Sequence, residues 1–247
     1  MRASSSAPDF IDNCSSTNTT PPTGTGTNDT ASSNGNGGSG NGFDDNFVFD
    51  FDWSNDGGVF LCKDKWSKDD IKINSPGLVI IENCKFDHHI KIVNSNVKII
   101  NSEVREDISM EGSRVQIINT KVGHNIKLEK GSMAEIKEIQ VLHDIKVSAS
   151  KIRIAESTIK HSIKLNHKPT NIVLIEHNSI GKDIKVKNSM AKMIQNIVTH
   201  DIKCKDSTVL LISNEVGGKV KGCEFDESAS HDDEHHDHDD DNDEEDN

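Results

Sequence analysis

The stretch DIKVSASKIRIAESTIKHSIKL, residues 144–165, decides the fold, because a short pattern in it returns after 18 residues. The pattern is a tetrapeptide of a polar residue, Ile, Lys and an aliphatic residue, seen as Asp144–Val147 and again as Ser162–Leu165. In the chain around this stretch, copies start at residues 70, 89, 107, 125, 144, 162, 183, 201 and 219, the last one partial. Their spacings are 19, 18, 18, 19, 18, 21, 18 and 18 residues, so the chain contains an array of repeats.

Within each repeat, apolar residues alternate with polar ones in short bursts. In the repeat from Asp144, Ile145 and Val147 form one pair, Ile152 and Ile154 form a second, and Ile159 follows. Alternation with period two is typical of a strand with one buried face, and the spacing of an amphipathic helix is absent. Small polar residues separate the bursts, which indicates short strands joined by tight corners.

Three short strands per repeat predict an all-β, single-stranded parallel β-helix, or β-solenoid, of about nine coils of 18–19 residues. Stacked coils hydrogen-bond about 4.8 Å apart, which would give a rod roughly 40 Å long. The apolar spacing of 2, 5, 2, 5 and 4 differs from the alternation of 2 and 4 in left-handed hexapeptide helices. We therefore expect a right-handed winding.

The repeats, for example Ile108–Val122 (ISMEGSRVQIINTKV), resemble those of short-coil right-handed parallel β-helix proteins. This class includes bactofilin-like polymer-forming proteins and uncharacterised surface-repeat proteins. The resemblance covers roughly residues 70–222 and concerns architecture alone. A shared fold does not by itself imply a shared function.

Composition divides the chain into four segments. Residues 1–42 are mostly Ser, Thr, Asn, Gly and Pro and cannot bury enough surface to fold, so we expect a disordered head. We expect an aromatic cap at 43–69, the solenoid at 70–225 and a disordered tail at 226–247. The tail has 13 acidic and no basic residues, whereas 70–225 has 24 basic and 18 acidic residues and a net charge of +6.

The two ends of the solenoid need covering, because open sheet edges promote aggregation. Phe47, Phe49, Phe51 and Trp53 alternate with smaller or acidic residues, so one strand would place all four rings on one face. We expect these rings to cover the first coil; the alternative is an exposed patch for a partner. At the other end, closure falls to Lys219–Phe225.

When the coils stack, the residues at the first and third positions of the tetrapeptide form two rows on one outward face. The third position of the tetrapeptide is lysine in eight of nine copies: Lys72, Lys91, Lys127, Lys146, Lys164, Lys185, Lys203 and Lys221. The first position is often aspartate: Asp70, Asp107, Asp144, Asp183 and Asp201. One interpretation is a self-neutralising, salt-bridged face. The other is a face that binds a linear polyanion or a mineral.

Two groups of histidines raise the question of metal binding. In the tail, histidines interleave with carboxylates, and the candidate ligands are His231, His235, His236, Asp237, His238 and Asp239. Such a run binds divalent ions weakly, and the alternative is a solubilising tail. A second group precedes the tetrapeptide: His88, His124, His143, His161 and His200. Because Gly123, Gly181 and Gly217-Gly218 occur at the same corner, we interpret it as a turn with positive φ, or alternatively as a metal- or pH-sensing row.

Five cysteines leave one unpaired or intermolecular. Cys62 and Cys84 lie about one coil apart at the first end, and Cys204 and Cys223 lie one coil apart at the last. These spacings allow two disulfides, with Cys14 left over; the alternative is buried free thiols. Three glycosylation triplets begin at Asn13, Asn18 and Asn28, and they would matter in a secreted protein.

These features favour a non-catalytic structural or adhesive solenoid that can self-assemble in a surface, coat or extracellular layer. The first alternative is a binding module for divalent metal ions or a polyanion, acting through the tail and the lysine row. The second is a polysaccharide-active enzyme, which would need sugar-stacking aromatics that the repeats lack. We expect no tightly bound cofactor, no nucleic acid partner and no transmembrane segment. An extracellular or surface location is slightly favoured, although no signal peptide is visible.

Overall fold

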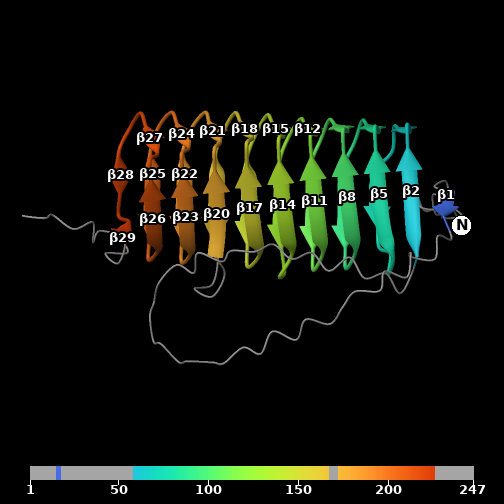
Figure 1. Ribbon diagram of the computed structural model, residues 1–247, viewed down its shortest axis with the longest axis horizontal. Coiled ribbons are helices and arrows are strands. Elements are labelled where there is room, and N and C mark those ends of the chain that lie inside the picture. The colour runs from blue at the N-terminus through green and yellow to red at the C-terminus, as the bar shows by residue number, and fades with distance from the viewer. Residues whose placement is uncertain (1–14, 18–57, 167–171, 226–247) are drawn as a thin grey trace, which may run out of the picture.

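The computed structural model describes residues 15–17, 58–166 and 172–225 and confirms the predicted all-β parallel β-solenoid (Figure 1). The chain winds through three long sheets, and no helix occurs in the described segments. Each full coil contributes one strand to each sheet, so the strands of a sheet lie side by side along the rod. The right-handed sense of the winding stays a prediction.

We name the sheets A, B and C. Sheet A has 11 strands in the order β1 (Ser15–Thr17), β2 (Val59–Lys63), β5 (Leu78–Glu82), β8 (Asn96–Ile100), β11 (Arg114–Ile118), β14 (Met133–Lys137), β17 (Lys151–Ala155), β20 (Ile172–Glu176), β23 (Met190–Ile194), β26 (Thr208–Ile212) and β29 (Glu224–Phe225). Sheet B has nine: β3 (Trp66–Ser67), β6 (Lys85–Phe86), β9 (Glu103–Val104), β12 (Lys121–Val122), β15 (Gln140–Val141), β18 (Thr158–Ile159), β21 (Ser179–Ile180), β24 (Ile197–Val198) and β27 (Glu215–Val216). Sheet C also has nine: β4 (Ile71–Ile73), β7 (Ile90–Val93), β10 (Ile108–Glu111), β13 (Ile126–Glu129), β16 (Ile145–Ser148), β19 (Ile163–Asn166), β22 (Ile184–Lys187), β25 (Ile202–Lys205) and β28 (Val220–Lys221).

The tetrapeptide that defines the repeat forms sheet C. Its isoleucines lie directly above one another: Ile90 pairs with Ile108, and Ile108 with Ile126. These side chains point inward and are fully buried. Burial of one such side chain stabilises a fold by about 1.5–3 kcal/mol. Because a single coil has no partner for its apolar side, this stabilisation depends on stacking.

Two of the three corners are built from a residue with positive φ followed by a buried serine or similar residue. Asn101 has φ 51°, and the Ser102 hydroxyl after it donates to the Ile100 carbonyl at 2.8 Å. The Ser102 hydroxyl oxygen also accepts the Cys84 N–H from the preceding coil at 3.1 Å. Asparagine tolerates the left-handed region better than most residues, so the repeated Asn-Ser pairs have a direct structural reason.

The third corner, between sheets B and C, contains the histidines. The expected positive φ is wrong here: none of His88, His124, His143, His161 or His200 has it. The glycines of this corner lie outside the positive-φ region too. Gly123 is needed for another reason, because a Cβ there would clash with the Arg105 carbonyl oxygen of the coil before. Close approach of the coils, rather than a special backbone angle, selects glycine at this position.

The first end of the rod differs from the expected boundaries. Strands β2 and β3 lie within 43–69, so the coiled part begins at Val59 rather than at residue 70. Ser15–Thr17, within the head expected to be disordered, forms β1 and pairs antiparallel with β2. This pairing hydrogen-bonds the outer edge of sheet A, which would otherwise be open. The aromatic residues 47–53 lie outside the described residues.

At the last end, the expected closing segment contains β28 and β29, which continue sheets C and A. Val220 there is 39% exposed, so this coil buries less of its apolar surface than the coils before it. Residues 167–171 of the longest repeat lie outside the described residues. The strands on either side keep the register, with Leu165 opposite Val186 and Ile154 opposite Ile175.

Candidate functional site

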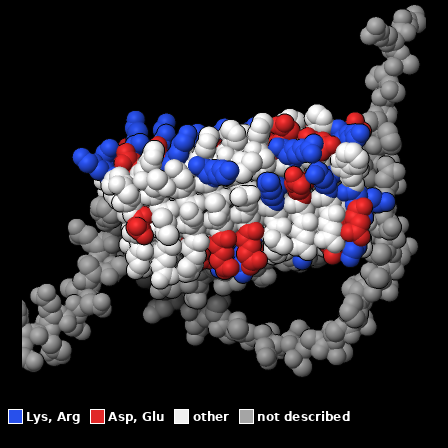
Figure 2. All heavy atoms as spheres, turned by 90° about the horizontal axis from the view of Figure 1, so that it is seen from above, with Lys and Arg blue, Asp and Glu red and all other residues white. Residues whose placement is uncertain are grey.

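The lysine row exists as a single stack on the outward side of sheet C. In register from the first coil to the last it runs through Lys72, Lys91, Ser109, Lys127, Lys146, Lys164, Lys185, Lys203 and Lys221. Figure 2 shows basic side chains gathered along one long edge of the rod, beside a broad band of uncharged side chains. The lysines therefore share one face, as the repeat predicts.

The aspartate row links each coil to the next. Oδ1 of Asp107 accepts the backbone N–H of Asn125 at 2.8 Å, and Oδ2 accepts the Lys127 ammonium. The same pair of contacts, one coil apart, recurs at Asp144, Asp183 and Asp201. One carboxylate thus receives a corner N–H with one oxygen and neutralises a lysine with the other.

These contacts keep the carboxylates ionised. Partial burial raises the pKa of Asp107, but the Lys127 ammonium and the Asn125 N–H groups outweigh it and lower the pKa to about 2. The N–H of Lys219 and the ammonium groups of Lys221 and Lys203 also hold the pKa of Asp201 well below its usual range. Most of the lysine face is therefore internally neutralised, as the salt-bridge interpretation expects.

The histidine corner forms a stack of rings in the middle of the rod. The ring centroids of His124 and His143 lie 5.0 Å apart, and those of His143 and His161 lie 4.7 Å apart. His124 Nδ1 lies 2.6 Å from a Glu106 carboxylate oxygen. Desolvation, together with the positive charges of Lys182 and His143, lowers the pKa of His161.

The structure assembles no metal centre in the segments that it describes. No three His, Cys, Asp or Glu side chains come together there in a way that could hold an ion. The tail residues His231 to Asp239 lie outside the described residues, so metal binding by the tail stays a prediction. The glycosylation candidates Asn13, Asn18 and Asn28 also lie outside them.

The cysteines pair differently from expectation at the first end. Cys204 and Cys223 are joined by a disulfide with Cα atoms 4.7 Å apart. The expected Cys62–Cys84 disulfide is wrong, because Cys84 is a free buried thiol and Cys62 is disulfide-bonded elsewhere. Cys62 stands in register with Ile81, three residues before Cys84, which explains why spacing of about one coil was a poor guide. Among the described cysteines Cys84 is the free thiol. Cys14, which was expected to be the one left over, lies outside the described residues.

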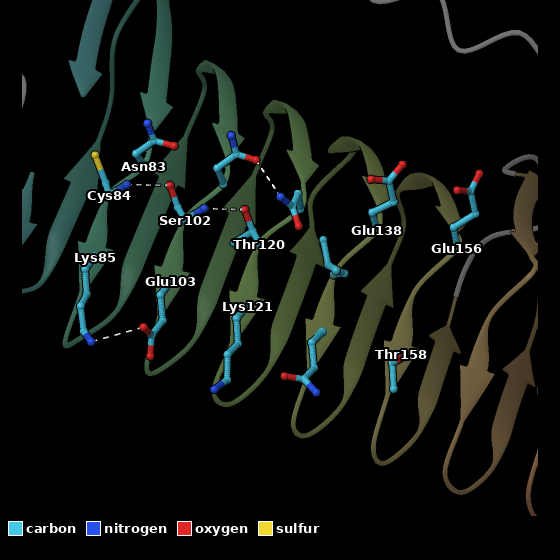
Figure 3. Close-up of a pocket in the computed structure, with 14 residues that line it drawn as sticks. Asn83, Cys84, Lys85, Ser102, Glu103, Thr120, Lys121, Glu138, Glu156 and Thr158 are labelled. Atoms are coloured by element: carbon cyan, nitrogen blue, oxygen red, sulfur yellow. Dashed lines mark hydrogen bonds and ion pairs between the residues drawn. The ribbon is translucent and has the colours of Figure 1, made fainter. Parts of the chain in front are cut away.

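A groove of about 640 Å³ runs along the corner between sheets A and B (Figure 3). One wall carries the positive-φ residues Asn83, Asn101, Asn119, Glu138 and Glu156. Its polar groups already bind one another: the Asn119 amide donates to Asn101 at 2.8 Å, and Lys85 pairs with Glu103 at 3.3 Å. The groove is therefore a regular polar surface, and many of its polar side chains already have hydrogen-bond or ion-pair partners within the groove.

The outward face of sheet A has an apolar character that the repeat analysis missed. One row of this face contains Ile100, Ile118, Ile194 and Ile212, and it is interrupted in the middle by Lys137, Ala155 and Glu176. Ile212 is 37% exposed. The signal was present as adjacent apolar pairs such as Ile117-Ile118, which break the alternation of a strand with one buried face.

Comparison with known proteins gives no relative: no protein-family model, no curated protein and no solved structure matches the chain. The resemblance to short-coil β-helix proteins therefore holds at the level of architecture. Within the described segments there is also no helix with the length and apolarity of a membrane span.

Proposed function

We propose that this protein is a non-catalytic structural β-solenoid, a rod that serves in a surface, coat or extracellular layer and can associate with further copies. The observation that carries the proposal is the unbroken register of sheets A, B and C along the whole described rod. Carboxylates that bridge successive coils reinforce this register on sheet C. Such an arrangement produces length and regular surfaces rather than a single concave centre.

Sideways association is supported by the apolar outward face of sheet A. Exposed apolar surface that is arranged on a flat sheet is a frequent basis of protein contacts. The apolar residues of the row form two pairs on either side of a charged middle, where Arg153 binds Glu135 at 3.2 Å and also binds Glu176; Lys63 and Glu82 precede the first pair. This pattern favours contacts between rods in a defined register.

Electron microscopy of the purified full chain at several salt concentrations tests the proposal. We expect filaments, sheets or paired rods from the natural sequence, and isolated rods from Ile118→Lys combined with Ile194→Lys. Thr158→Lys, on the outward side of sheet B, is the matched control and should leave assembly unchanged. Isolated rods for the natural sequence at every salt concentration would refute the self-association.

The binding alternative keeps support at one place on the lysine face. Where Ser109 interrupts the row, the neutralising pattern is also interrupted, and a hollow opens.

A further inference from the structure

The lysine row of sheet C has one irregular position, Ser109. It lies in register between Lys91 and Lys127, where every other described coil carries a lysine. Because the serine side chain is much shorter, a hollow of about 320 Å³ opens over β10. This volume is at the small end of the range for ligand pockets, which suits a ligand of one or two rings.

The charge pattern changes at the same place. In later coils, an aspartate binds the lysine of the next coil, so Asp70 should bind Lys91. Instead the Lys91 ammonium lies 3.3 Å from Glu111, and Asp70 accepts the backbone N–H of His89, at 3.1 Å, and no lysine of the described segments. Lys72 has no ion pair with any described carboxylate, unlike the other lysines of the row.

The hollow therefore combines the Lys72 ammonium, which has no ion pair among the described residues, with a carboxylate oxygen of Asp70 that no described lysine binds. Lys72 and Lys91 stand on adjacent strands about 4.8 Å apart, so one oxyanion can reach both ammonium groups. The second oxygen of Asp70 is an acceptor without a lysine partner. The Ser109 hydroxyl can donate and accept, and all these residues line the hollow.

His89 adds a donor. Its Nδ1 accepts the backbone N–H of Asp107 at 3.2 Å, so a neutral ring carries its proton on Nε2. A ligand that satisfies this set needs one anionic group for the lysines and hydroxyl groups for the carboxylate, the imidazole and the serine. A simple anion would leave Asp70 facing it, and a neutral sugar would leave the Lys72 ammonium without an anionic partner.

We propose that the hollow at Ser109 binds an acidic sugar, a ring that carries a carboxylate or sulfate group together with free hydroxyls. The site is open along the rod, so the sugar can be free or part of a glycan chain. The proposal goes beyond the structural role and does not depend on self-association.

The main test compares galacturonate with galactose and with acetate, each titrated into the full chain by calorimetry and by NMR of the Ser109 and His89 amides. We expect galacturonate to bind at least about tenfold more tightly than either partial probe, because each lacks half of the contacts. Acetate or galactose binding as tightly as galacturonate would overturn the proposal. Trigalacturonate that binds more tightly than galacturonate would support a glycan chain as the source, and equal binding would support the free sugar.

Two variants separate a built site from general attraction of anions to a basic face. Ser109→Lys restores the regular row, so it should fold, and it fills the hollow while adding a positive charge. We expect galacturonate affinity to fall by about tenfold or more. Thr158→Lys adds the same charge on sheet B and should leave affinity within a factor of about two. If both variants bind galacturonate more tightly than the natural chain, general electrostatics explains the binding and the proposal is wrong.

Asp70→Asn gives an independent check with the opposite charge change. The asparagine Oδ1 can still accept the His89 N–H, but the free carboxylate oxygen becomes an amide nitrogen. Removal of a negative charge should strengthen the binding of any simple anion, and acetate serves as that reference. We expect galacturonate to bind more weakly in this variant, and stronger galacturonate binding would contradict the role of Asp70.

Discussion

At the scale of single residues, the corner serines connect the sequence repeat to its stability. The Ser95 hydroxyl donates to the Val93 carbonyl at 2.7 Å and accepts the Ser75 N–H of the coil before at 2.8 Å. An N–H at a corner cannot join the regular strand ladder, so without such an acceptor it would be buried unpaired. A short hydroxyl that serves two coils solves this problem at many of the corners, and an asparagine amide oxygen does so at others.

Ser102→Ala tests this role. The substitution leaves the Cys84 N–H and the Ile100 carbonyl without the Ser102 hydroxyl in a buried corner. We expect the free energy of unfolding, measured with urea, to fall by about 1–3 kcal/mol. Ser148→Ala, on a half-exposed strand position, is the control and should change it by less than about 0.5 kcal/mol. Equal effects of the two substitutions would contradict the assignment.

Ala149 occupies a positive-φ corner position at 47°, where Asn94 and Asn188 stand in other coils. Left-handed backbone is costly for alanine, whereas asparagine adopts it readily. Ala149→Asn should therefore raise the free energy of unfolding by up to about 1 kcal/mol. Ser148→Asn, one residue earlier in β16, should give no gain, because asparagine is unfavourable in strands. A loss of stability in Ala149→Asn would show that the corner does not select by backbone angle.

At the scale of strands and sheets, the Asp–Lys contacts predict how stability depends on pH. The pKa of Asp107 is lowered to about 2, below its ordinary value in an unfolded chain. Its contribution is therefore complete at neutral pH and is lost as the pH falls from about 4 toward 2. Asp107→Asn should lower stability at neutral pH and flatten this acid dependence.

Urea unfolding between neutral pH and pH 2 measures the effect. Glu103→Gln is the control, because its exposed pair with Lys85 on sheet B contributes little. We expect the control to keep the acid dependence of the natural chain. An Asp107→Asn variant with an unchanged acid dependence would mean that other carboxylates cause it.

The same scale separates what the sequence could predict from what it could not. The tetrapeptide predicts sheet C and its lysine row, because period-two alternation and constant spacing determine face and register together. Cys84 shows the limit, since spacing of about one coil does not say which residues of two coils face each other. The histidine corner shows a second limit of sequence-based prediction. A glycine can be required by close approach of two backbones as well as by a positive φ, and the sequence does not distinguish the two reasons. The hollow at Ser109 could not be predicted, because its recognition depends on which neighbouring side chains form ion pairs, and the repeat pattern does not contain this information.

At the scale of the whole molecule, the rod is nearly one-dimensional, because each coil contacts mainly the coils before and after it. Its stability is then a sum of coil and interface contributions, and damage should remain local. A coil at either end of the rod has a neighbouring coil on one side only, so fewer interface contributions stabilise it. There β1 pairs with β2, and the Cys204–Cys223 disulfide ties the last coils together.

Two cavity-forming substitutions test this locality. Ile126→Ala removes a fully buried side chain from the middle of sheet C, and Val209→Ala removes one near the last end of sheet A. The first should cost about 2–5 kcal/mol and the second somewhat less, because valine is smaller. Native-state hydrogen exchange should show the loss of protection around β10, β13 and β16 for the first variant, and around β23 and β26 for the second. If each variant instead lowers protection equally in every strand, the coils unfold as one unit, since a cooperative rod would spread any local loss over its whole length.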